Sequence, residues 1–360
     1  MRFSAHSGNF QKKRENKMAL EKYVVSNDKS IYEAWPDIVK TKSGKLVCVF
    51  SECKHHGDRD QARIVYKESL DKGKTWSDKT ALTEKSTSDN YYNCARISKL
   101  PDDTLVIIAD YVIKNESHNA KTYLWKSIDD GKTWKGPFDT PSQGIVPDKL
   151  LVLKSGRWIL SSHFLDISIN KLVQYLWYSD DSGITWSDRI TVAKDEKYNL
   201  CEASILEVED NVLIAFLREN SWEGYDCFKA FSYDGGETWD GVYKIPVPGC
   251  HRPVTGFLSD GRILMTYRFI QGGKQGWGRT TQNFMGCIFD KQTALEKERR
   301  QQQTRIFPID YDRNPKADLG YSGWVQFEDG TIYVVNYLLD DEPKGQIRGY
   351  TFKIEDFLFS

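Results

Sequence analysis

Ionisable and aromatic side chains recur around pairs of apolar segments in this sequence. Some lie just before the first segment of a pair, and others lie just after the second. The residues before the first segment of each pair include Arg96, Glu202, Arg252 and Tyr321. Those after the second segment are Glu52, Asp110, His163, Arg218, Arg268 and Tyr337. Such groups can bind a charged ligand and transfer protons, and they are costly to bury unless they pair or bind something. An internal salt-bridge network is the alternative, because clustered ionisable groups indicate a functional site only as a matter of probability.

The apolar segments that would position these residues come in six pairs, each joined by a polar turn. The turns are Ser43-Gly44, Asp102-Asp103, Ser155-Gly156, Asp210-Asn211, Asp260-Gly261 and Asp329-Gly330. Their chemistry predicts β-hairpins. The first strands are expected at 37–41, 96–100, 149–153, 203–208, 254–258 and 323–327, and the second at 46–51, 105–109, 158–162, 212–217, 263–267 and 332–336. Six such hairpins predict six propeller blades, whose innermost strands surround a channel, so that residues at the strand starts converge on one face.

A second repeat has the form S-x-D-x-G-x-T-W. Its four copies begin at Ser69, Ser127, Ser179 and Ser232, with steps of 58, 52 and 53 residues. A fixed period of this size is typical of propellers and other repeat arrays. The Asp and Gly predict a tight turn, and Thr-Trp resumes a strand with a large apolar anchor. We therefore predict an all-β fold, a six-bladed β-propeller in which this motif, the Asp box, joins strands three and four of the first four blades.

Blades five and six lack the motif. In blade five, residues 291–304 are charged, free of Gly and rich in helix formers, which predicts a surface helix or a solvated insertion. The last strand, near residues 349–353, is expected to pair with an N-terminal strand near 22–26, because such closure removes exposed sheet edges.

Composition narrows the classes of function. A net charge of −1, from 50 basic and 51 acidic residues, argues against a nucleic-acid binder, and no apolar run reaches membrane-spanning length. The seven Cys have no C-x-x-C spacing and indicate free thiols rather than a zinc site, so no metal or other cofactor is expected. The polar, basic residues 1–17 predict a disordered extension rather than a secretory signal, followed by one domain over 18–360 and a cytoplasmic location.

The four Asp boxes and six blades resemble the sialidase (neuraminidase) superfamily, from about Lys22 to the end of the chain. In that family a glutamate opens the inner strand of blade four and an arginine ends the next strand, which implies Glu202 and Arg218. A tyrosine opens the inner strand of the last blade, which implies Tyr321. The acid/base aspartate precedes the first Asp box. Asp58 lies eleven residues before Ser69, with Asp60 as the near alternative.

The resemblance extends to substrate-binding arginines but departs from the family at one of them. A further arginine in blade five is matched best by Arg279, with Arg268 as competitor. The family's first carboxylate-binding arginine, in an R-I-P motif, corresponds here to Ala34. Either Arg96 or Arg252 substitutes for it in space, or the substrate has no carboxylate at that place.

The resemblance implies a retaining exo-glycosidase that hydrolyses terminal sialic acid or a related acidic sugar. A carboxylate nucleophile would be repelled by the carboxylate on the anomeric carbon of a sialic acid, whereas a tyrosine hydroxyl is neutral until a base such as Glu202 draws off its proton. Arg218 and Arg279 would bind the anionic group, and Asp58 would protonate the leaving oxygen. Two alternatives stay open: a glycosidase or lyase on another acidic sugar, and a carbohydrate-binding propeller without catalysis. In the plainest reading, Tyr321 is a core aromatic, Asp58 a solvated loop residue and Glu202–Arg218 an internal ion pair.

Overall fold

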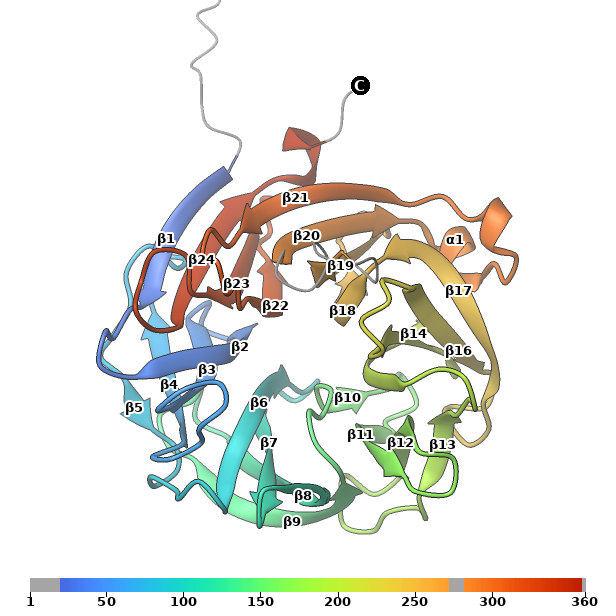
Figure 1. Cartoon of the computed structure of the whole chain (residues 1–360), viewed down its shortest axis with the longest axis horizontal. Helices are drawn as coiled ribbons and strands as arrows, with labels where there is room; N and C mark the ends of the chain where they lie inside the picture. Colours follow the sequence, from blue (N-terminus) through green and yellow to red (C-terminus); the bar gives the residue numbers. More distant parts are fainter. Residues whose placement is uncertain (1–19, 272–281, 358–360) are drawn as a thin grey trace, which may run out of the picture.

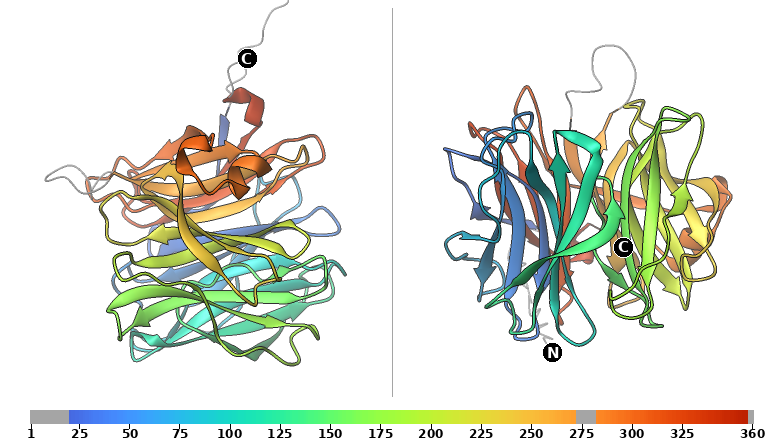
Figure 2. Two further views of the ribbon diagram at one scale, coloured as in Figure 1. Left: turned by 90° about the vertical axis from the view of Figure 1, so that its right-hand side faces the viewer. Right: turned by 90° about the horizontal axis from the view of Figure 1, so that it is seen from below.

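The computed structural model describes residues 20–271 and 282–357. Within them, six four-stranded antiparallel sheets stand around a central axis, as Figure 1 shows. The side views of Figure 2 show the connecting loops gathered on the two opposite faces of the disc. The predicted all-β fold with six blades is therefore confirmed. The expected extension at 1–17 and Arg279 lie outside the described residues.

Each blade runs from an inner strand to an outer one. Blade one holds β2 (Tyr32–Lys40), β3 (Leu46–Cys53), β4 (Arg63–Ser69) and β5 (Thr80–Ala81), and blade two β6 (Tyr91–Lys99), β7 (Leu105–Ile113), β8 (Glu116–Ser127) and β9 (Lys135–Gln143). Blade three holds β10 (Leu151–Val152), β11 (Trp158–Asp166), β12 (Lys171–Ser179) and β13 (Ile190–Ala193), and blade four β14 (Leu200–Glu209), β15 (Val212–Glu219), β16 (Asp226–Ser232) and β17 (Asp240–Pro248). Blade five holds β18 (Cys250–Phe257), β19 (Ile263–Ile270), β20 (Gln282–Phe289) and β21 (Arg305–Tyr311).

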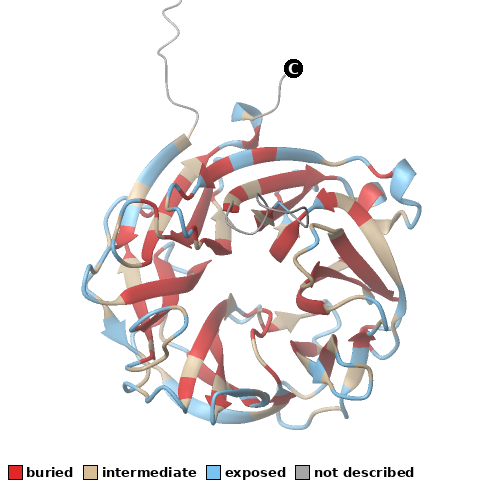
Figure 3. Cartoon of the chain, viewed as in Figure 1, coloured by how far each residue is buried: buried red, intermediate tan, exposed pale blue. Residues whose placement is uncertain are grey.

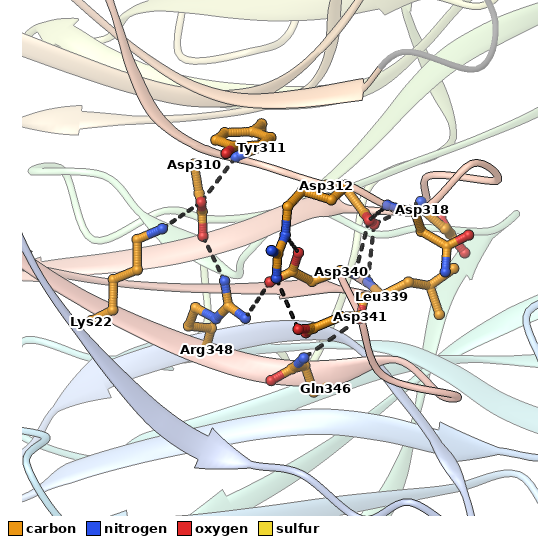
Figure 4. Close-up of polar contacts among 12 residues, drawn as sticks. Lys22, Asp310, Tyr311, Asp312, Asp318, Leu339, Asp340, Asp341, Gln346 and Arg348 are labelled. Atoms are coloured by element: carbon orange, nitrogen blue, oxygen red, sulfur yellow. Dashed lines mark hydrogen bonds and ion pairs between the residues drawn. The ribbon is translucent and has the colours of Figure 1, made fainter.

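Blade six closes the ring with both ends of the described chain. It holds β22 (Gly320–Gln326), β23 (Ile332–Leu338), β24 (Gln346–Phe352) and, outermost, β1 (Leu20–Ser26). β1 pairs antiparallel with β24, with Tyr23 opposite Gly349, as the sequence predicted. Figure 4 shows polar contacts that join this closure to blade five, where the carboxylate of Asp310 on β21 accepts hydrogen bonds from Lys22 at 2.6 Å and from Arg348 at 2.9 Å.

The Asp boxes form equivalent turns between the third and fourth strands. In the first copy the Ser69 hydroxyl accepts the Gly73 N–H at 2.8 Å, and Asp71 accepts the N–H of Thr75 at 2.9 Å. Hydrogen bonds from Thr75 lower the pKa of Asp71 to about 2. Gly73 has φ +87°, and a Cβ there would lie 2.1 Å from the Tyr333 ring, so only glycine fits. The other three copies repeat the serine and threonine contacts.

Apolar side chains pack between neighbouring blades rather than in one central core. One cluster joins Val47 and Val49 of blade one to Ile97 and Ile107 of blade two, and five further clusters join the other pairs of neighbours around the ring. Figure 3 shows the inner strands buried and the outermost strands largely exposed. This packing fixes the blades against one another, so that residues at the inner strand starts keep fixed mutual positions.

Two predicted elements differ from the structure. The inner strand expected at 149–153 is only β10 (Leu151–Val152). Residues 291–304, expected as a surface helix or a solvated insertion, form a short helix, α1 (Lys291–Leu295), and one 3-10 turn (Arg299–Gln301). α1 is partly buried, with Ala294 in the apolar cluster between blades four and five, and Lys229 Nζ donates to three carbonyls at its end, at 2.6–3.2 Å. In the part of the chain that is described, no helix has the length and apolar character needed to cross a membrane.

Candidate active site

A residue of positive φ, between 36° and 55°, lies within the first four residues of five of the inner strands and five residues before the sixth, β10. These residues are Trp35, Cys94, Val146, Glu202, Arg252 and Tyr321. At five of the six positions the strand register shifts beside the residue. Bulges of this kind re-aim a side chain that regular strand geometry would place elsewhere. The fold therefore sets a ring of six equivalent positions at one end of the channel, and Glu202 and Tyr321 both belong to it.

Glu202 connects the ring to two other predicted site residues. Its Oε1 accepts a hydrogen bond from Arg218 at 2.7 Å and one from the Tyr321 hydroxyl. All three side chains are buried, at 4–7% exposure. Burial is the largest influence on the pKa of Glu202 and would raise it, but the surrounding groups, with the positive charge of Arg218 first among them, together outweigh burial and hold the pKa at about 2. Burial and the Glu202 charge raise the pKa of Tyr321 well above its usual value, so the resting pair is a carboxylate and a phenol.

Arg252 and Arg96 lie deep in the channel. Arg252 is 1% exposed and donates to the Pro147 carbonyl at 2.9 Å, and its guanidinium lies 5.6 Å from the Tyr321 ring. Arg96 is 2% exposed and donates to the carbonyls of Pro36 and Ser322, both at 3.1 Å. Burial and the charge of Arg252 lower the pKa of Arg96 to about 10. Both arginines join blades across the channel, and whether either one replaces the arginine missing at Ala34 stays a prediction.

Arg268 lies beside the Glu202–Tyr321 pair. Its guanidinium is 5.8 Å from the Tyr321 ring and donates to the Leu319 carbonyl at 3.2 Å. Trp222 lies between it and Arg218, with guanidinium-to-ring distances of 5.9 and 5.5 Å. Of the two blade-five arginines that the sequence offered, Arg268 is the one described, and with Arg218 and Arg252 it places three cations around the phenol.

His163 contacts Glu202 through the main chain, since its Nδ1 accepts the Glu202 N–H at 3.4 Å. Burial lowers the pKa of His163 to about 4, so the ring is neutral at pH 7. His163, Cys201 and Glu202 offer ligand atoms within 4.8 Å of one another. The guanidinium of Arg218 already binds this Glu202 carboxylate and would repel a cation, so the group is a poor metal site.

Asp58 and Asp60 lie on the loop of residues 54–62, and among the described residues no hydrogen bond or ion pair joins either carboxylate to a ring residue. The Asp58 carboxylate is 40% exposed, lies 3.1 Å from Lys54 Nζ and accepts the Asp60 N–H at 3.0 Å. These two hydrogen bonds lower its pKa, so Asp58 holds no proton near neutral pH. The same loop places the Arg59 guanidinium 4.0 Å from the Trp35 ring.

Several residues at this face escaped the sequence analysis. The sequence does contain a signal for Trp35, which follows Ala34. Trp35 occupies the same strand-start position in its blade as Glu202 and Tyr321 do in theirs. The sequence contains no such signal for the four loop residues at this face, which are Trp222, Arg59, His56 and Asp318. Of the residues after the second strands, Tyr337 reaches this face, with ring centroids 6.4 Å from Tyr321. Glu52 instead pairs with Arg63 at 2.5 Å and with Lys79 at 2.9 Å.

Asp110 lies within β7, just past the strand that the sequence predicted at 105–109. It is fully buried, and neither carboxylate oxygen has a hydrogen-bond partner among the described residues. Burial raises the pKa of Asp110 to about 7, although the positive charges of Arg59 and Arg252 act to lower it. A carboxyl with this pKa is partly protonated at neutral pH, which reduces the cost of burying it.

A cavity of about 620 Å³ opens at the other end of the channel. It is lined by the far halves of the inner strands, for example at Ile38, Ile97, Leu206 and Trp324. None of the described residues that the sequence analysis expected in the site lines it. The ring and this cavity are therefore separate features of the same channel.

Comparisons with known proteins agree with this architecture. The chain matches the BNR repeat-like domain family over residues 87–334. A sialidase of Clostridium perfringens is 25% identical over 225 residues, which are 52% of this chain and 57% of that protein, and a sialidase of Bacteroides fragilis (strain YCH46) is 30% identical over 132 residues, 34% and 23%. The chain thus spans little more than half of the first of these relatives and under a quarter of the second.

Solved structures share the fold at lower identity. A protein of unknown function from Dyadobacter fermentans DSM 18053 has a TM-score of 0.76 at 21% identity, covering 93% of this chain and 99% of that one. A Hadza microbial sialidase has a TM-score of 0.71 at 17% identity, with 94% and 69% covered. Trypanosoma rangeli sialidase in complex with sialic acid has a TM-score of 0.64 at 16% identity, with 94% and 59% covered. With the family match, the six blades and the Asp boxes, these findings show that the chain belongs to the BNR repeat-like domain family, as a sialidase-like six-bladed propeller.

Proposed function

We propose that the protein is a retaining exo-glycosidase of the sialidase type that removes a terminal acidic sugar. The observation that carries this proposal is the Glu202 carboxylate, whose Oε1 accepts hydrogen bonds from both the Tyr321 hydroxyl and Arg218. A phenol that is hydrogen-bonded to an ionised carboxylate has a base in place to take its proton when its oxygen attacks. A solely structural tyrosine would not need a buried charge at this position.

In the proposed first step the Tyr321 oxygen bonds to the anomeric carbon, its proton passes to Glu202, and the bond to the leaving oxygen breaks. The positive charges of Arg218 and Arg268 lie close to the phenol and stabilise the negative charge that develops on it. The same two side chains attract a carboxylate on the sugar. The leaving oxygen needs a proton, which the family resemblance assigns to Asp58. Water then hydrolyses the tyrosyl intermediate with retention of configuration.

Sialic acid is one candidate substrate. The residues at the start of the inner strand of blade one favour a second candidate. Where sialidases carry an arginine, this chain has Ala34, which is fully buried, followed by Trp35 in the ring position. A carboxylate would therefore meet two flanking arginines, Arg218 and Arg268, and an indole. A differently placed carboxylate, such as that of a uronic acid, fits this set as a second candidate.

A panel of fluorogenic glycosides tests the proposal, with sialosides, uronides and neutral sugars as the three arms. Tyr321→Phe should abolish turnover of any substrate that the wild type cleaves. Tyr333→Phe is the matched control, because the Tyr333 hydroxyl is buried too but donates to the Gly73 carbonyl at 2.8 Å, within an Asp-box turn. It should retain activity and lose some thermal stability.

The outcomes separate the candidates. Cleavage of a sialoside, or of a uronide alone, identifies the substrate. A wild type that cleaves none of the three classes, yet binds glycans on an array in a way that Arg218→Ala abolishes, would make the protein a binding propeller. Full activity in Tyr321→Phe would refute the nucleophile assignment.

A further inference from the structure

Trp222 lies on the loop between β15 and β16 and takes no part in the mechanism described above. The centre of its ring lies 5.5 Å from the guanidinium of Arg218 and 5.9 Å from that of Arg268. It also packs edge-on against the His251 ring, with centroids 5.0 Å apart. These three neighbours are buried, at 2–5% exposure, whereas Trp222 itself is half-buried. One loop residue therefore lies against both cations that the proposed reaction uses.

The backbone holds Trp222 in a conformation that a bulky side chain rarely adopts. Its φ is +67°, in the left-handed region. The buried Glu219 carboxylate accepts the N–H of Ser221 and that of Asn199, both at 3.0 Å, which ties the loop to the residue before β14. Strain of this kind persists only where the surrounding structure enforces it, and it concentrates at functional sites. The fold thus keeps the indole in this place at an energetic cost.

The two arginines differ in how their charge is balanced. Arg218 pairs with Glu202 at 2.7 Å. Among the described residues, no carboxylate oxygen lies within 4 Å of the Arg268 guanidinium, which donates to the Leu319 carbonyl at 3.2 Å and lies 3.4 Å from His251 Nδ1. Burial, followed by the charges of Arg218 and Arg268, lowers the pKa of His251 well below its usual value, so His251 is neutral. Arg268 therefore carries a buried positive charge that the carboxylate of a ligand can neutralise.

An indole beside two cations has a defined electrostatic effect. The face of a tryptophan ring carries negative potential and attracts a guanidinium within about 6 Å of its centre. Trp222 is in this range of both Arg218 and Arg268, so it offsets their mutual repulsion and keeps them near one another. A carboxylate binds a guanidinium through the N–H groups at its edge, and the attraction to a ring face leaves such groups available.

We propose that Trp222 makes the site selective for acidic sugars, by holding Arg218 and Arg268 in position for one carboxylate. The inference rests on the proposed function for its class of substrate. Trp222 acts as a positioning residue. A neutral sugar gains little from two aligned cations, whereas an acidic sugar loses affinity when they move apart. Because this chain has Ala34 where the resemblance expects a carboxylate-binding arginine, the alignment of the remaining cations matters more.

Binding of a carboxylate, measured without turnover, tests this role. The probes are the methyl glycosides of sialic acid and of a uronic acid, each compared with its methyl ester, which lacks the charge. Dissociation constants are measured by ligand-observed NMR in the Tyr321→Phe background, so that no probe is cleaved. Trp222→Leu should weaken binding of the acid on the order of tenfold and leave that of the ester unchanged. Trp222→Phe keeps an aromatic face and should recover most of the loss.

Trp186→Leu is the matched control. Trp186 is also half-buried, but its Nε1 donates to the Gly183 carbonyl at 3.2 Å, within the Asp box of blade three. The substitution should lower the melting temperature and leave both dissociation constants unchanged. A difference between acid and ester that appears in Trp222→Leu and not in Trp186→Leu is a result that loss of structure alone does not produce.

The failure of each proposal is distinguishable. Equal weakening of acid and ester in Trp222→Leu, or no change in either, overturns the role of Trp222 and leaves the proposed function standing. Trp222→Phe binding the acid as weakly as Trp222→Leu also overturns it, because the role requires an aromatic face. A wild type that cleaves no glycoside, while binding of the acid still depends on Trp222, overturns the proposed function and leaves the carboxylate site standing. A protein that binds neither acid overturns the role of Trp222, whatever the glycoside panel shows.

Discussion

Replacing Glu202 by glutamine should destabilise the protein by about 3 kcal/mol at neutral pH. Glutamine has the shape of a protonated glutamate, so the substitution removes the charge and little else. The pKa of Glu202 falls from its usual 4.5 to about 2 in the folded protein, and at about 1.4 kcal/mol for each pKa unit this fall corresponds to about 3 kcal/mol. Breaking a buried ion pair typically costs about 3–5 kcal/mol, because the partner, here Arg218, keeps an unpaired charge.

The pH dependence makes this prediction specific. Because the folded pKa lies below the unfolded one, the stabilisation is fully present above pH 4.5 and is lost as the pH falls towards about 2. The stability difference between wild type and Glu202→Gln should therefore shrink across this range, since a protonated Glu202 resembles glutamine. Urea unfolding at several pH values measures it.

Arg218 provides the control through a double-mutant cycle. Arg218→Met on its own should cost a similar free energy, and the double variant should cost clearly less than the sum of the two. A difference that does not change with pH, or additive costs, would refute the claim that the ion pair dominates at Glu202. The catalytic role of Glu202 would then need a separate explanation.

Three other predictions test the fold and the site. Gly73→Ala should lower the free energy of unfolding by several kcal/mol, because its Cβ would lie 2.1 Å from the Tyr333 ring. Gly44→Ala is the control, also at φ +87° but with nothing within 4 Å, and should cost about 1 kcal/mol. Equal melting temperatures for the two variants would contradict this. Lys229→Met should cost about 1–3 kcal/mol and speed proteolysis near α1, since Nζ donates to three carbonyls there. Arg268→Ala should raise KM for an acidic glycoside at least tenfold and leave that for a neutral one unchanged; an equal change in both would mean that Arg268 does not bind the carboxylate.

Much of the architecture could be predicted because it depends on short sequence motifs. The six polar turns and four Asp boxes each specify a hairpin within a few residues, through hydrogen bonds such as that from the Gly73 N–H to Ser69. The number of blades follows from counting them. The same rule, that strand starts converge, placed Glu202 and Tyr321 at one end of the channel.

The roles of individual charged side chains could not be predicted in the same way. Arg96 and Arg252 stand at strand starts like Glu202, yet they donate to main-chain carbonyls of other blades. Asp58 matches the family pattern in spacing, but its carboxylate faces Lys54 on its own loop. Sequence spacing fixes where a backbone position falls, whereas the partner of a side chain depends on which other groups lie within about 3 Å of it.

The sequence by itself thus determined the fold class and the number of blades, because both depend on hairpins whose strands are near neighbours in the chain. The ring closure was predicted from the need to cover exposed sheet edges, since β1 and β24 lie at opposite ends of the described chain. Only the tertiary structure decided that Tyr321 bonds to Glu202 across 119 residues and that Asp318 meets His56 across 262. Such contacts arise where blades one, four and six meet at the channel. The packing of whole blades sets their positions, and a short stretch of sequence does not predict that packing.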